Sequence, residues 1–145
     1  MALPDPHPGL VICYSYLWAT EHGSGQEEGL KDRPCVIVVA RQVVADQTLV
    51  TVVPVTHAPP TDPQAAIEIP PQIKARLGLD EQQSWIIVSE VNDFIWPGPD
   101  LRHVAGSQPA RFDYGVLPPG FFRKVRDQLL ALYAARRVQA VPRTQ

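Results

Sequence analysis

Apolar residues fall in short runs, separated by polar segments that contain proline and glycine. The run over residues 35–40 holds six residues without a charge or an amide and is rich in β-branched types. Such a run is too short for a typical helix and is typical of a strand buried on both faces. Pro34 suits the start of a strand, and it restricts Arg33 to an extended backbone. The pattern therefore predicts a rigid buried strand with a permanent cation at its mouth.

Further strands are predicted on both sides of this segment. The strongest candidates cover residues 10–18, 48–56, 66–69 and 84–91, and weaker ones cover 101–104 and 114–117. A turn at residues 45–47 makes 35–40 and 48–56 a hairpin. Pro54 lacks an amide hydrogen for a ladder, so it places its strand at a sheet edge or at a bulge.

Two helices complete the pattern. A short one is predicted over residues 72–77, after Pro70-Pro71 and with Gly78 as its C-terminal cap. A longer one begins after Pro118-Pro119, because apolar residues recur there at helical spacing: Phe121, Phe122, Val125, Leu129, Leu132 and Tyr133. Short strands with one long terminal helix predict a mainly β fold with α, namely a small, strongly curved sheet or barrel capped by an amphipathic helix.

Composition restricts the function classes. The 145 residues suit a single domain over 1–145, with residues 1–8 and 138–145 expected to be loose tails. A formal net charge of −2 disfavours charge-driven, non-specific nucleic-acid binding, so any anion site must be local. Cys13 and Cys35 both lie in apolar runs, which favours buried thiols over a disulfide or metal site. The absence of a signal peptide or membrane span from the pattern predicts a soluble, cytoplasmic protein.

Three segments in a fixed order resemble a known family. They are Lys31-Asp32-Arg33-Pro34 before an apolar strand, Pro54-Val55-Thr56 at the end of the next strand, and residues 84–91, followed by a terminal helix. This order resembles the MazF/PemK toxins of bacterial toxin–antitoxin pairs over roughly residues 8–133. The resemblance implies an SH3-like barrel with a C-terminal helix and a homodimer. It also implies metal-independent, cofactor-free endoribonuclease activity on single-stranded RNA, neutralised by a cognate antitoxin.

Carried over by position, Arg33 and Thr56 match the family's active-site arginine and threonine. Glu28 matches the acidic residue in the preceding loop over residues 21–30, and Glu90 falls where some members have an aspartate. Two positions depart from the family pattern: Val88 stands where such members have an arginine, and Glu27 stands where some have a histidine, a role that His22 or His57 could take over.

RNA cleavage without a metal needs a base for the 2′-hydroxyl, cationic donors on the phosphate and an acid for the departing oxygen. Arg33 suits the phosphate, and Thr56 suits a phosphate oxygen or the 2′-hydroxyl. Glu90 and His57 are the candidates for base or acid. We expect Lys31, Glu28 and Trp96 to contact RNA, Trp96 by stacking on a base.

Each residue also has an ordinary interpretation. Arg33 could pair with Glu28, and Thr56 could be a simple strand former. His57 and Glu90 could be solvated surface groups, and Trp96 could belong to the core or to a dimer interface. The alternative function is a binding protein on the same fold, either a poison of a protein target as CcdB is for gyrase, or a catalytically silent relative. No phosphate-binding glycine loop, zinc spacing or nucleophile elbow occurs in the sequence.

Overall fold

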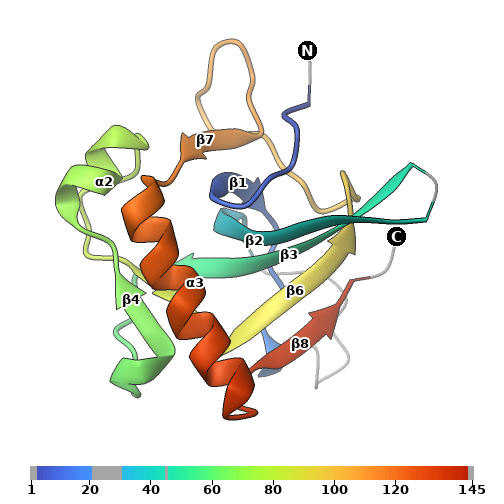
Figure 1. Ribbon diagram of the computed structural model, residues 1–145. Helices are drawn as coiled ribbons and strands as arrows, with labels where there is room; N and C mark the ends of the chain where they lie inside the picture. Colours follow the sequence, from blue (N-terminus) through green and yellow to red (C-terminus); the bar gives the residue numbers. More distant parts are fainter. Residues whose placement is uncertain (1–2, 21–30, 45, 144–145) are drawn as a thin grey trace.

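The computed structural model describes residues 3–20, 31–44 and 46–143, and it is mainly β (Figure 1). Within these ranges the chain forms one branched, eight-stranded sheet with two named α-helices. The strands are β1 (Leu10–Tyr14), β2 (Arg33–Val44), β3 (Gln47–Thr56), β4 (Ala66–Glu68), β5 (Trp85–Ile87), β6 (Glu90–Ile95), β7 (Asp113–Val116) and β8 (Gln139–Pro142). The helices are α2 (Pro71–Arg76) and α3 (Pro119–Ala134), with a short 3₁₀ helix, η1, at Pro63–Ala65.

Strand β2 lies at the centre of the fold, as its apolar pattern predicts. It pairs antiparallel with β1 on one side and with β3 on the other. Cys35 and Ile37 belong to one hydrophobic cluster, whereas Val36 and Val38 belong to a second cluster on the opposite face. All four side chains are buried. The prediction of a strand covered on both faces and beginning near Pro34 is confirmed.

The sheet is open. Its main order is β4-β5-β3-β2-β1-β7, and β6 also pairs with β3 and carries β8 on its far side. Within the described residues β4, β7 and β8 each have one partner strand, so the pairing does not close a barrel. The predicted mainly β class with a C-terminal helix is confirmed, while the sheet branches at β3 and does not form the barrel that was the alternative.

The segment over residues 84–91, predicted as one strand, is divided between β5 and β6. Both strands pair with β3, but Val52 lies opposite Asn92 whereas Val55 lies opposite Ile86. The chain between Ile86 and Asn92 is therefore longer than the stretch of β3 between Val52 and Val55 that it lies beside. Pro54 lies at that interruption, so its missing amide hydrogen is tolerated in a strand with partners on both sides. The bulge interpretation of Pro54 fits this position, and the edge interpretation is wrong.

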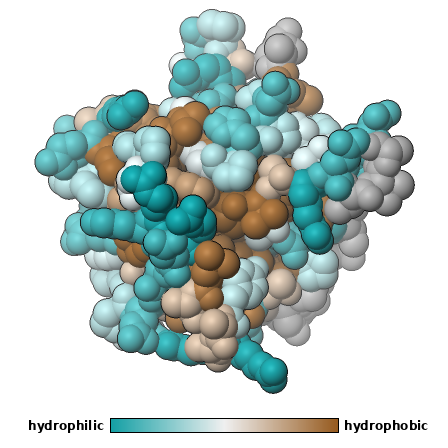
Figure 2. Space-filling view, viewed as in Figure 1, coloured by the Kyte–Doolittle hydropathy of each residue, from teal (hydrophilic) through white to brown (hydrophobic). Residues whose placement is uncertain are grey.

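Helix α3 covers one face of the sheet, as Figure 1 shows. Its buried residues are Phe121, Val125, Leu129 and Leu132, and they pack against the cluster that contains Val36 and Val53. Leu130 and Tyr133 remain exposed. In the same view, Figure 2 shows mostly hydrophilic side chains over this helix with scattered hydrophobic ones. The amphipathic prediction holds, except that Tyr133 faces solvent.

The C-terminal segment is not the loose tail expected from its composition. Strand β8 pairs in parallel with β6, and Arg143 just beyond it is 8% exposed. The Arg143 guanidinium lies 2.9 Å from Asp100 Oδ2 and donates to the Ser15 carbonyl at 2.8 Å and to Asn92 Oδ1 at 3.1 Å. These partners lie far away in the chain, so local sequence gives no sign of them.

Other regions differ in smaller ways. The weak strand expected over 101–104 is reduced to a single bridge between Tyr14 and Leu101, while the expected strand near 114–117 is β7. Cys13 and Cys35 are free and buried, as predicted. Among the described residues, no helix has the length and apolar character that crossing a bilayer requires.

We expect Arg143→Ala to lower the free energy of unfolding by about 3 kcal/mol, because it removes the main cationic partner of the buried Asp100 carboxylate. Arg126→Ala is the matched control, since Arg126 pairs with Asp127 on the exposed face of α3. Urea denaturation followed by circular dichroism measures both changes. Equal, small losses would show that the C-terminal segment does not contribute to the core.

Candidate functional site

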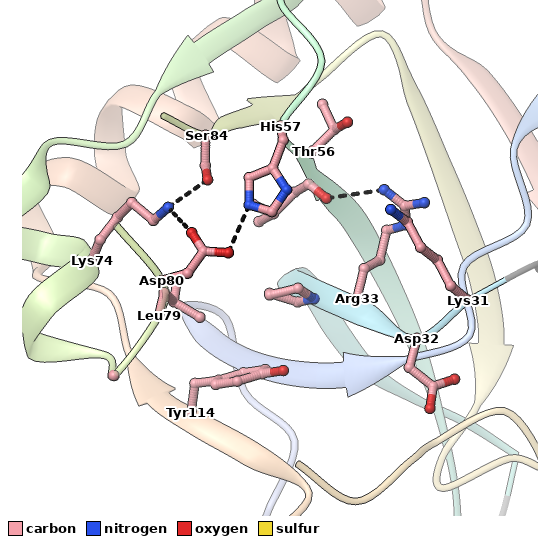
Figure 3. Close-up of a pocket in the computed structure, with 13 residues that line it drawn as sticks. Lys31, Asp32, Arg33, Thr56, His57, Lys74, Leu79, Asp80, Ser84 and Tyr114 are labelled. Atoms are coloured by element: carbon pink, nitrogen blue, oxygen red, sulfur yellow. Dashed lines mark hydrogen bonds and ion pairs between the residues drawn. The ribbon is translucent and has the colours of Figure 1, made fainter. Parts of the chain in front are cut away.

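A cleft of about 270 Å³ opens where β2 begins and β3 ends (Figure 3). Cys35 pairs with Pro54 across these antiparallel strands, so the start of β2 and the end of β3 lie side by side at the same end of the sheet. Arg33 and Thr56 both line the cleft, together with His57. Two strands that the sequence identified therefore bring three of the candidate residues together.

Arg33 is held by β3 and by the segment that follows β1. Its Nη1 donates to the Val55 carbonyl at 3.3 Å, and its guanidinium carbon lies 5.0 Å from the centre of the Trp18 ring. The buried Nε has no hydrogen-bond partner among the described residues. Because a guanidinium carries five N–H donors, one hydrogen bond and one ring contact leave donors available for an anion in the cleft.

Thr56 lies beside Arg33 at the edge of the cleft. Its Oγ1 accepts a hydrogen bond from the Ala58 amide at 3.1 Å, which retains the hydroxyl hydrogen as a donor. A second hollow of about 420 Å³ also contains Lys31, Arg33 and Thr56 in its wall. These three residues therefore line both hollows.

His57 faces Asp80 across the cleft. The His57 Nε2 atom lies 2.8 Å from Asp80 Oδ2, and both side chains are about half exposed, at 45% and 50%. Figure 3 shows the imidazole between the Asp80 carboxylate and Arg33. A histidine oriented by a carboxylate is an arrangement suited to proton transfer.

The other oxygen of Asp80 contacts Lys74, a buried lysine of α2. Lys74 Nζ donates to Asp80 Oδ1 at 2.6 Å, to Ser84 Oγ at 2.6 Å and to the Gln82 carbonyl. Only 6% of the Lys74 side chain is exposed. The three donors of the ammonium group are thus all engaged, which satisfies a buried charge that would otherwise be costly.

The backbone after α2 explains how Asp80 returns to Lys74. Gly78 has φ +69°, and its amide donates to Ala75 while the Leu79 amide donates to Lys74. This pair of hydrogen bonds is the Schellman C-cap that the Gly78 signal predicts. It reverses the chain, so that Asp80 reaches the ammonium group on the preceding helix.

Electrostatics keep Asp80 ionised. The hydrogen bond from Lys74 holds the pKa of the Asp80 carboxyl below its usual value, and the nearby His57 contributes in the same direction. Tyr114, on the opposite wall of the cleft, has its pKa raised because it is partly buried. The cleft therefore contains a fixed anion beside the imidazole and a neutral phenol across from it.

Glu90 does not line the cleft. Its Oε1 accepts hydrogen bonds from the Tyr16 hydroxyl at 3.1 Å and from the Ala19 amide at 2.9 Å. Both contacts fix the segment that follows β1, in the neighbourhood of Trp18. The structure therefore gives Glu90 a place in the support of the site, outside the two hollows.

Trp96 also lies outside the cleft and packs against the hydrophobic cluster around Phe94, with ring centroids 6.2 Å apart. The aromatic residue beside Arg33 is Trp18, which lines the second hollow. Lys31 is exposed and lines both hollows. Glu28, Glu27 and His22 lie outside the described residues.

Sequence reasoning did not identify Lys74, Asp80, Ser84 or Tyr114. The one available signal was the glycine cap at Gly78, which implies that the following residues fold back toward the helix. Among the described residues, no three side chains of His, Cys, Asp or Glu gather closely enough to hold a metal ion.

The protein is thus an open β-sheet protein with an arginine, a hydroxyl and a histidine in one cleft. The sequence matches the family model described as "PemK-like, MazF-like toxin of type II toxin-antitoxin system" over residues 16–94, more than half of the chain. The protein belongs to this family, which confirms the resemblance. A comparison with curated proteins found no significant match. The matched region includes β2, β3 and the Lys74–Asp80 segment.

The ionised Asp80 should contribute to stability in a pH-dependent way. Since its pKa is lowered on folding, the contribution is present above the ordinary aspartate pKa of about 4 and is lost as the pH falls through the lower, folded-state value. Chemical denaturation of wild type and Asp80→Asn between pH 7 and pH 3 should therefore show a stability gap that narrows toward acid. A gap that stays constant over this range would contradict the assignment.

Proposed function

We propose that this toxin is an endoribonuclease that cleaves single-stranded RNA without a metal ion or cofactor, and that a cognate antitoxin neutralises it. The family to which the chain belongs supports the proposal. The observation that carries it is the convergence of Arg33, Thr56 and His57 on one cleft. Cellular RNA as substrate implies action in the cytoplasm, and the family resemblance implies a homodimer.

In this proposal, Arg33 binds the scissile phosphate and stabilises the charge that builds on its oxygens. The Thr56 hydroxyl donates to a phosphate oxygen or holds the 2′-hydroxyl. His57 acts as the general base, since its ring lies between Asp80 and Arg33. Glu90 is not used, because it contacts Tyr16 and Ala19 outside the cleft.

The chemistry balances as a transesterification. His57 accepts the proton of the 2′-hydroxyl, the 2′-oxygen forms a bond to phosphorus, and the bond from phosphorus to the 5′-oxygen breaks. Water protonates the departing 5′-oxygen, and the hydroxide that remains takes the proton from His57, which restores the base. The products are a 2′,3′-cyclic phosphate and a 5′-hydroxyl end, and proton transfer of this kind typically contributes about 10²- to 10⁴-fold to the rate.

A binding protein without nuclease activity is the second candidate, and one observation favours it. Val88, which stands where some members of the family have an arginine, is fully buried. The side chain at this position cannot reach RNA, so the site works with one cation fewer. A protein that poisons another protein, or a catalytically silent relative, would accommodate this departure.

We expect the wild-type protein to cut a long single-stranded RNA into discrete fragments in the presence of EDTA. Arg33→Ala should slow cleavage by about 10²- to 10³-fold, the usual cost of losing one well-placed donor to a developing anion. Arg41→Ala is the matched control, since Arg41 lies on the same strand but is exposed and outside the cleft. Cleavage rates are read from gels of end-labelled RNA.

Equal rates for Arg33→Ala and wild type would contradict the assignment of Arg33. Intact RNA with the wild-type protein, together with growth arrest when it is expressed, would favour the protein-poison candidate.

A further inference from the structure

We propose that Asp80, held by Lys74, is a positioning residue that fixes the His57 imidazole for proton transfer. The inference rests on the proposed function for its kinetic consequence, whereas the geometry can be tested without RNA. Asp80 and Lys74 belong to no motif by which the chain resembles its family. They reach the cleft from α2 and the loop after it, whereas Arg33 and Thr56 come from the sheet.

The two oxygens of Asp80 have different partners. Oδ1 accepts from Lys74 Nζ at 2.6 Å and from the Gln82 amide at 3.1 Å, while Oδ2 lies 2.8 Å from His57 Nε2. Anchoring one oxygen to the buried Lys74 fixes the plane and direction of the carboxylate. The other oxygen then presents a defined acceptor to His57.

This anchoring matters because the imidazole itself is poorly confined. His57 follows the end of β3, and 45% of its side chain is exposed. An exposed histidine samples several rotamers, and ordering it has an entropic cost. A carboxylate that is itself held in place reduces this cost, so the ring stays oriented toward the phosphate site.

The contact also determines which ring nitrogen carries the hydrogen. An ionised carboxylate is only an acceptor, so Nε2 of neutral His57 must donate and Nδ1 must keep its lone pair. In Figure 3 the second ring nitrogen lies on the side of Arg33. The unprotonated nitrogen thus faces the position of the phosphate, as a general base requires.

Of the other charged groups that line the cleft, Asp32, Arg33 and Lys74 have partners other than the imidazole. Lys31, Asp32 and Arg33 line the same cleft, and Lys74 lies behind Asp80. Arg33 donates to the Val55 carbonyl, and Asp32 lies 3.6 Å from Arg102. Of these charged groups, Asp80 is the one that contacts the His57 ring.

The kinetic test compares Asp80→Ala and Lys74→Met with wild type. We expect Asp80→Ala to lower kcat by roughly 10- to 100-fold with little change in KM, because it disturbs the base and leaves the phosphate contacts intact. Lys74→Met should cause part of this loss, and Asp80→Glu should restore part of it. Asp62→Ala is the control, since Asp62 pairs with Arg137 away from the cleft.

A double-mutant cycle separates positioning from a general structural role. In a His57→Ala background, Asp80→Ala should cause no further loss of kcat, because the group that it positions is already gone. If Asp80 only stabilises the loop, the second substitution should lower the rate by the same factor in both backgrounds. That additive result, with thermal unfolding unchanged, would overturn the proposal.

The second test needs no RNA. Nitrogen-15 NMR of the imidazoles, with His57 assigned by a His57→Gln variant, should show a hydrogen on Nε2 alone in the neutral ring. Asp80→Ala should raise the fraction that carries the hydrogen on Nδ1. A wild-type ring protonated mainly on Nδ1, or an unchanged ratio in Asp80→Ala, would overturn the proposal.

The two tests distinguish this inference from the proposed function. A single Nε2–H form in a protein that leaves RNA intact would support the positioning contact and contradict the nuclease proposal. Arg33-dependent cleavage that is insensitive to Asp80→Ala would support the nuclease proposal and contradict the positioning role.

Discussion

The structure depends on one constraint, the burial of β2 on both faces. Cys35 and Ile37 pack on one side, Val36 and Val38 pack on the other, and the backbone pairs with β1 and β3 along both edges. A strand enclosed in this way can neither slip in register nor rotate without moving its whole apolar set to the wrong face. Arg33 is the first residue of β2, so the rigid core fixes the backbone position of the cation at the cleft.

The second half of the site is built differently. Asp80 lies on a loop and is half exposed, and it obtains its position from Lys74, whose buried ammonium group also contacts Ser84 and the Gln82 carbonyl. The Schellman cap at Gly78 makes this return of the chain possible. A rigid strand thus supplies the cation proposed to bind phosphate, while a network centred on Lys74 holds Asp80 beside the histidine proposed to accept the proton.

Much of the fold could be predicted because it follows from local patterns. The β2–β3 hairpin, the Gly78 cap and the amphipathic face of α3 each depend on neighbouring residues. Long-range pairing could not be predicted in this way. No local pattern predicts strand β8 or the burial of Arg143, because their partners, Asn92 and Asp100, lie elsewhere in the chain. The division of residues 84–91 into two strands likewise depends on how they pair with β3, which lies far away in the sequence.

The sequence by itself determined that a buried strand begins beside Arg33 and that the next strand ends at Thr56, because hydrophobic period and proline position are local properties. Only the tertiary structure decided that His57 faces Asp80, that Lys74 holds Asp80, and that Glu90 and Trp96 lie away from the cleft. Side chains that meet through a loop and a helix carry no shared sequence pattern. Their meeting depends on how α2 and the sheet pack, which is a property of the whole fold.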